Sequence, residues 1–169
     1  MAARTDRRVE VFRVPPVVLW ISAGAALLLQ TILPLKISLA RLFDFPLLIT
    51  IYFALLRRSK VFAIGLGTVL GLLQDALSHG FVGIFGMAKA LIGYLAASAN
   101  VKFDLEQFVP RLMFAGILIF LHSLFLAGLE RLLLERPMPH LLEMLSALLV
   151  NLALGLVVFQ VLDHFKRPA

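Results

Sequence analysis

The sequence predicts an all-α integral membrane protein, folded as a compact bundle of six transmembrane helices. Of its 169 residues, 61% are hydrophobic and 15% are charged, whereas about 25% of the residues in an ordinary soluble domain are charged. The mean hydropathy of +0.97 leaves too few polar side chains to cover a soluble surface. The apolar residues are gathered in six blocks, and a span needs about 20 of them, so little chain remains for a soluble domain.

The six blocks define one membrane domain over residues 16–163. A basic arm, residues 1–15, precedes it, and a short tail, residues 164–169, follows it. Proline is well tolerated in the first turn of a helix, so Pro46 and Pro139 favour helix starts at the second and sixth blocks. The expected spans cover residues 16–35, 42–56, 61–77, 81–99, 111–134 and 141–162.

The lysines and arginines in the loops, in the terminal segments and at the polar ends of these spans are distributed unevenly. Eleven lie in the two terminal segments and the second and fourth loops, which share one side of a six-span chain, and four lie in the first and fifth loops. Short loops rich in Lys and Arg stay in the cytoplasm. The distribution therefore predicts that both termini are cytoplasmic.

No pattern in the chain predicts catalysis, a metal site or a cofactor. The sequence has no cysteine, which excludes disulfides, thiol chemistry and Cys-ligated zinc. The histidines lack HExxH spacing, the serines lack a GxSxG setting, and no paired acidic motif for Mg²⁺ is present. The basic residues are scattered between apolar blocks, which argues against a nucleic-acid-binding face.

Glycines are concentrated in the third and fourth spans. Gly67 and Gly71 form a GxxxG pair, and Gly93 belongs to a face of small residues on the fourth span. Small residues allow helix backbones to approach closely within lipid. These positions predict a tightly packed hairpin, and they match neither a dinucleotide fingerprint nor a P-loop.

Four polar residues fall within or near the predicted spans. Asp75 and Lys89 are ionisable, and a charge in hydrocarbon costs about 2.5–3.5 kcal/mol on insertion scales. A mutual ion pair or a lysine that snorkels is the structural interpretation, and a polar site that opens outward is the functional one. An interhelical hydrogen bond accounts for His122 and Asn151.

The loop before the sixth span carries an amphipathic turn. Arg131 and Glu135 have the i,i+4 spacing of a helical ion pair. The turn is expected to lie along the outer membrane interface, where its leucines contact lipid or a partner. Those leucines are Leu132, Leu133 and Leu134.

Several short motifs occur in and before the third and fourth spans. They are Gly67, Gly71-Leu72-Leu73-Gln74-Asp75, Gly80, Gly83, Leu91-Ile92-Gly93-Tyr94-Leu95, Gln30-Thr31 and Tyr52-Phe53-Ala54-Leu55-Leu56-Arg57-Arg58. In these motifs the chain resembles the family of bacterial rod shape-determining proteins MreD. In that family an aspartate often follows a proline at the start of the second span, whereas here Asp44 precedes Phe45-Pro46.

The resemblance implies a non-enzymatic scaffold in the bacterial cytoplasmic membrane. It implies that the chain binds MreC and helps to couple MreB filaments to peptidoglycan synthesis by RodA and its partner transpeptidase. It also implies a fold similar to that of the substrate-binding subunits of energy-coupling-factor vitamin transporters. Such a subunit is the alternative function, for which Ser22 and Ala26 provide a small-xxx-small docking face.

Overall fold

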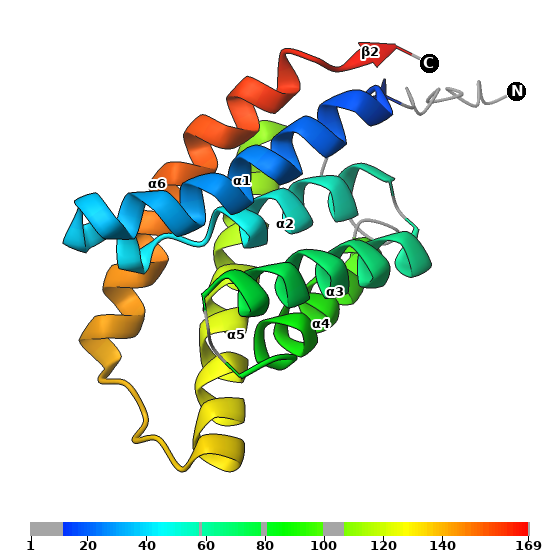
Figure 1. The fold of residues 1–169 in the computed structure, drawn as a ribbon. Coiled ribbons are helices and arrows are strands. Elements are labelled where there is room, and N and C mark those ends of the chain that lie inside the picture. The colour runs from blue at the N-terminus through cyan, green and yellow to red at the C-terminus, as the bar shows by residue number, and fades with distance from the viewer. Residues whose placement is uncertain (1–11, 58, 79–80, 100–106, 169) are drawn as a thin grey trace, which may run out of the picture.

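The computed structural model describes residues 12–57, 59–78, 81–99 and 107–168. The all-α class is confirmed, because six α-helices account for most of these residues (Figure 1). A 3-10 helix, η1 (Ser38–Leu42), and two strands of two residues each, β1 (Phe12–Arg13) and β2 (Arg167–Pro168), complete the regular structure. The helices are α1 (Pro16–Lys36), α2 (Phe45–Arg57), α3 (Lys60–Leu77), α4 (Ile84–Ala99), α5 (Phe108–Leu134) and α6 (Leu141–Asp163).

The six helices differ in their ability to cross a bilayer. By length and composition, α1, α3, α5 and α6 are candidate membrane spans. Helices α2 and α4 have 13 and 16 residues, which gives lengths of about 20 and 24 Å against a hydrocarbon core of about 30 Å. The structure thus supports four of the six predicted spans by length.

Helix α2 forms the core of the bundle. All ten residues from Pro46 to Leu55 are buried, and α2 packs against α1, α3, α4, α5 and α6. A helix that is apolar on every side belongs in the interior. Because other helices surround α2, its length does not have to match the thickness of the lipid.

Two helices begin three residues later than expected. Helix α2 starts at Phe45 and not at residue 42, because residues 38–42 form η1 and the chain is extended at Phe43. Helix α4 starts at Ile84 and not at residue 81, because a turn ends at Gly83 with φ +110°. A side chain at that φ is strained, so glycine suits this position.

The close packing of α3 and α4 predicted from the glycines is present. A Cβ atom at Gly67 would lie 2.3 Å from the carbonyl oxygen of Lys89, and one at Gly71 would lie 2.4 Å from that of Phe85. A Cβ atom at Gly93 would lie 2.4 Å from the carbonyl oxygen of Ala63. Any larger residue at these three positions would force the two backbones apart.

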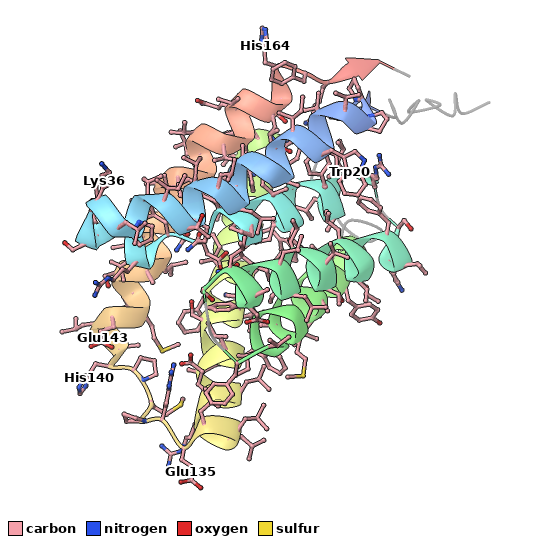
Figure 2. The ribbon with its side chains drawn as sticks, viewed as in Figure 1. Trp20, Lys36, Glu135, His140, Glu143 and His164 are labelled. Atoms are coloured by element: carbon pink, nitrogen blue, oxygen red, sulfur yellow. The ribbon has the colours of Figure 1, made fainter. Side chains whose placement is uncertain are left out.

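Helix α5 has 27 residues, or about 40 Å, and the turn at its end continues the helix (Figure 1). The predicted Arg131–Glu135 pair is wrong, because α5 ends at Leu134 and Glu135 is left-handed with φ 55°. Arg136 binds Glu130 at 3.1 Å instead. Figure 2 shows Glu135 at the tip of this projection.

The two ends of the described chain meet at one end of the bundle. Strands β1 and β2 pair in antiparallel fashion, with Phe12 opposite Pro168 and Arg13 opposite Arg167. This end is called the terminal end below, and the end that holds η1 and Glu135 is called the distal end. The arrangement requires an even number of membrane crossings between the two strands.

Reporter fusions test the predicted orientation. A fusion after Pro168 should report a cytoplasmic location, and one after Pro137 should report a periplasmic location. The side that holds the termini has eleven lysines and arginines, whereas the opposite side has four. The measurement is the ratio of alkaline phosphatase to fluorescent-protein activity at each site. A periplasmic signal after Pro168 would contradict the orientation.

Candidate functional site

A buried ion pair lies at the distal end of the bundle. Lys89 of α4 is fully buried, and its Nζ lies 2.7 Å from Oδ2 of Asp44, the residue before α2. Of the alternatives considered for Lys89, neither the ion pair with Asp75 nor a lysine that snorkels is found, because the ammonium is buried against Asp44. The ring of Phe85 lies 4.6 Å from the same Nζ and adds a cation–π contact.

Asp44 uses its second carboxylate oxygen to cap α2. Its Oδ1 accepts a hydrogen bond of 3.0 Å from the backbone N–H of Leu47, three residues further along. This is the geometry of an N-cap, and the positive end of the helix dipole also favours a carboxylate there. One side chain therefore starts α2 and binds it to α4.

Two amide side chains hold the non-helical backbone that leads into α2. Asn151 of α6 accepts from the N–H of Asp44 at 2.8 Å and donates to the carbonyl of Leu42 at 2.7 Å. Gln30 of α1 donates to the carbonyl of Phe43 at 2.9 Å and accepts from the N–H of Phe45 at 3.1 Å. Irregular backbone is tolerated at membrane depth when the protein satisfies it in this way.

His122 of α5 completes the cluster without a hydrogen bond at Nε2. This atom lies 3.9 Å from Oδ2 of Asp44, and it has no hydrogen-bond partner within the described part of the chain. The predicted hydrogen bond between His122 and Asn151 is wrong, because Asn151 binds the backbone of residues 42–44. The histidine instead faces the oxygen that Lys89 already occupies.

Asp75 closes the loop between α3 and α4. The residue is 1% exposed, and its carboxylate accepts backbone hydrogen bonds from Gly83, Phe85 and Gly86 at 2.8, 3.2 and 3.3 Å. Three amide donors stabilise the carboxylate charge. Asp75 thus fixes the start of α4, where φ at Gly83 is positive.

The other predicted residues fall in three places. Gln74 is 5% exposed, and its Oε1 has no partner among the described residues. Leu132 and Leu133 are exposed by 79% and 54% on the projecting end of α5. Gly67, Gly71 and Gly93 line the α3–α4 contact, whereas Gly80 lies outside the described residues.

A second polar cluster lies at the terminal end, and sequence reasoning missed it. Arg111 of α5 forms an ion pair with Asp163 of α6, which also accepts from the hydroxyl of Tyr52 at 2.8 Å and binds Lys166 at 2.8 Å. Arg111 is 4% exposed. Because Arg111 follows Pro110, the sequence pattern places it with the loop. In the structure it lies in the first turn of α5, and the packing of α5 against α6 places it beside Asp163.

The two clusters are built to hold helices together. In each cluster a buried cation is matched by a carboxylate. Among the described residues, no group of three or more His, Asp or Glu side chains has the geometry of a metal site. In the described part of the chain, these polar groups therefore connect helices to one another. The exposed apolar faces of the helices are the surfaces that remain for binding.

Comparison with known proteins identifies the chain's family. The family of rod shape-determining protein MreD matches residues 12–165. The chain belongs to this family. MreD proteins are membrane proteins with a role in determining rod shape, and they are not a known enzyme family. No curated protein and no solved structure matches the chain.

The matched range covers all six helices and both polar clusters. Asp44 differs from the common Pro-Asp order, yet it caps α2 and binds Lys89. The sequence signals for this role are an acidic residue at a helix start and a single lysine inside an apolar block. The partner amides, Gln30 and Asn151, lie 14 and 107 positions from Asp44 in the sequence.

Replacing one member of the buried pair should destabilise the protein more than replacing both. Asp44→Asn keeps an oxygen for the N-cap but leaves the Lys89 ammonium without a counter-charge, and we expect a loss of about 3–5 kcal/mol of unfolding free energy. Asp44→Asn combined with Lys89→Met should recover part of this loss. The measurement is reversible unfolding of the purified protein in mixed micelles.

Arg136→Met serves as the matched control, because it removes an ion pair whose arginine side chain is 57% exposed. Its effect should stay below about 1 kcal/mol. If the double variant is no more stable than Asp44→Asn alone, the ion pair does not account for the stability of the distal end.

Asp75 replacements should follow the number of amide hydrogen bonds that survive. Asp75→Asn keeps one acceptor oxygen, whereas Asp75→Leu leaves three N–H groups unsatisfied at about 1–3 kcal/mol each where they are buried. Adding Lys89→Met should not rescue Asp75→Leu, because the two residues do not pair. The measurements are membrane abundance and rod shape in cells that carry each variant. Full function of Asp75→Leu at normal abundance would contradict the assignment.

Proposed function

We propose that the protein is a non-enzymatic scaffold of the bacterial cell-elongation complex in the cytoplasmic membrane. In this proposal it binds MreC and, through that complex, helps to couple MreB filaments to peptidoglycan synthesis by RodA and its partner transpeptidase. The match to the MreD family over residues 12–165 is the observation that carries the proposal. Both termini lie in the cytoplasm in this arrangement, so the distal end faces the periplasm.

The surface of the bundle supports a binding role. Large apolar side chains are exposed along α1, α5 and α6, among them Trp20, Ile117 and Leu149 at 66%, 56% and 66%. Some of this surface must face lipid, and the rest is available to the helix of a partner, which packs by close van der Waals contact in a bilayer. The loops within the described part of the chain are short, so the helices provide most of the surface that is described.

The projecting end of α5 is the proposed contact for the part of MreC next to its membrane span. At about 40 Å the helix exceeds the hydrocarbon core, so its last two turns reach the outer interface. Leu132 and Leu133 are exposed there, beside the Arg136–Glu130 pair. An apolar surface at that depth suits an amphipathic juxtamembrane segment.

Photo-crosslinking in cells tests this contact. A photoreactive residue at Leu132 or Leu133 should capture MreC, because both side chains project from the tip of α5. Leu149 in α6 provides a matched position, since its exposure of 66% lies between those of Leu132 and Leu133 but the residue lies at membrane depth in this proposal. Capture of MreC at other positions on the bundle but never at Leu132 or Leu133 would overturn the contact and leave the scaffold role standing.

Affinity purification from native membranes tests the scaffold role itself. Recovery of MreC is the expected result. Recovery of ATPase subunits together with a tightly bound vitamin would instead support the alternative, a substrate-binding subunit of an energy-coupling-factor transporter. That result would overturn the scaffold.

A further inference from the structure

His122 of α5 is a buried imidazole that faces a carboxylate oxygen already in use. Its side chain is 4% exposed, and its Nε2 lies 3.9 Å from Oδ2 of Asp44. The same oxygen binds Nζ of Lys89 at 2.7 Å. A separation of 3.9 Å is too long for an N–H···O hydrogen bond, and Nε2 has no hydrogen-bond partner within the described part of the chain. Two groups that can carry a positive charge therefore face one acceptor.

The charged groups that face His122 come from the helices packed against α5. Helix α5 contacts α2, α4 and α6. Helix α4 contributes Lys89, and the residue before α2 contributes Asp44. Helix α6 contributes Asn151, an amide without charge, to the same cluster. The other titratable or charged side chains of these four helices are exposed or paired elsewhere and are Tyr52, Arg57, Tyr94, Arg111, Glu130, Arg131, Glu143 and Asp163.

A proton on His122 would leave the cluster with an unbalanced positive charge. While the imidazole is neutral, the charges of Lys89 and Asp44 cancel. Lys89 is fully buried and Asp44 is 9% exposed, so solvent would stabilise an excess charge poorly, and a buried charge without a counter-charge is strongly destabilising. Because the Asp44 carboxylate also caps α2, any shift of this group toward His122 weakens the start of α2 as well.

We infer that Asp44, Lys89 and His122 form an acid-sensitive latch at the distal end of the bundle. At neutral pH the imidazole is neutral, and Asp44 binds Lys89 and caps α2. In acid the imidazole takes up one proton from the solvent and competes with Lys89 for Oδ2 of Asp44, which loosens the contacts among α2, α4 and α5. The latch is a property of the chain alone and does not rest on the proposed function. In the orientation proposed above it faces the periplasm.

The folding equilibrium constant measured at about pH 7.5 and at about pH 5.5 tests the latch. The purified chain is unfolded reversibly in mixed micelles at each pH. In the unfolded chain an imidazole titrates near its ordinary pKa of about 6.5, whereas the latched chain takes up no proton at His122. Because the unfolded state then binds more protons, the folding constant should fall about tenfold from the higher to the lower pH. His122→Gln has no imidazole to titrate at this position and should lose the fall.

Lys89→Met should reverse the sign of the pH dependence. Without the lysine, His122 is the remaining group beside the Asp44 carboxylate that can carry a positive charge, among the residues that the structure describes. A protonated His122 then becomes the counter-charge, so the folded chain binds more protons than the unfolded one, and the folding constant should rise severalfold from the higher to the lower pH. Lys89→Met combined with His122→Gln should show neither effect. A histidine with a merely structural role would not produce this reversal.

His140→Gln is the matched control, because His140 is exposed just before α6 (Figure 2). Its imidazole is solvated in both states, so its loss should leave the tenfold fall in place. Nitrogen NMR chemical shifts of the imidazoles in the folded, unmodified chain provide a measurement that does not depend on whether the variants fold. At the lower pH they should show His140 protonated and His122 neutral.

Three results would overturn the latch. A tenfold fall that persists in His122→Gln would place the acid sensitivity in another group. A folding constant of Lys89→Met that falls with pH as it does in the unmodified chain would show that Lys89 and His122 do not compete for Asp44. A protonated His122 in the folded, unmodified chain at the lower pH would show that the cluster accommodates a second positive charge.

Discussion

The buried Lys89–Asp44 ion pair is the interaction on which the distal half of the bundle depends. A fully buried ammonium is tolerated only with a counter-charge, and the structure supplies that charge from the residue that caps α2. The position of Lys89 therefore fixes where the central helix begins. Asn151 and Gln30 then have to satisfy the backbone just before α2, which connects α6 and α1 to the same point.

The glycines of α3 make this arrangement possible. Gly67 lies against the carbonyl of Lys89, and Gly71 lies one turn away against Phe85 and Gly86. Because α3 comes so close, Asp75 at its end reaches the amides of the α3–α4 loop. The hydrogen bonds of the α3–α4 loop therefore depend on the close packing of α3 against α4. A larger residue at Gly67 or Gly71 would push the backbone at Lys89 away from α3. It would also move the Asp75 carboxylate away from the loop amides that donate to it.

The sequence predicted the helices well and the polar contacts poorly. Apolar blocks report directly on burial in lipid or protein, so the helix positions followed from composition, and the GxxxG spacing reported a contact between neighbours in sequence. The partner of Lys89 could not be read in the same way. Asp75 lies 14 residues before Lys89 and Asp44 lies 45 residues before it, yet the nearer carboxylate is occupied by backbone amides. Arg111 and Asp163 show the same limit, because which charges meet depends on how the helices pack.

Each of the two polar clusters holds helices together at one end of the bundle. The Lys89–Asp44 cluster joins α2 and α4 at the distal end, with α1 and α6 bound through their amides. The Arg111–Asp163 cluster joins α5, α6 and Tyr52 of α2 at the terminal end. Helix α2 takes part in both and is shielded along its length. Since polar contacts at both ends of the core fix the helices internally, the outer faces of α1, α5 and α6 are not required for folding in the same way. Those faces carry many of the exposed large apolar side chains and are consequently the ones available for contact with lipid.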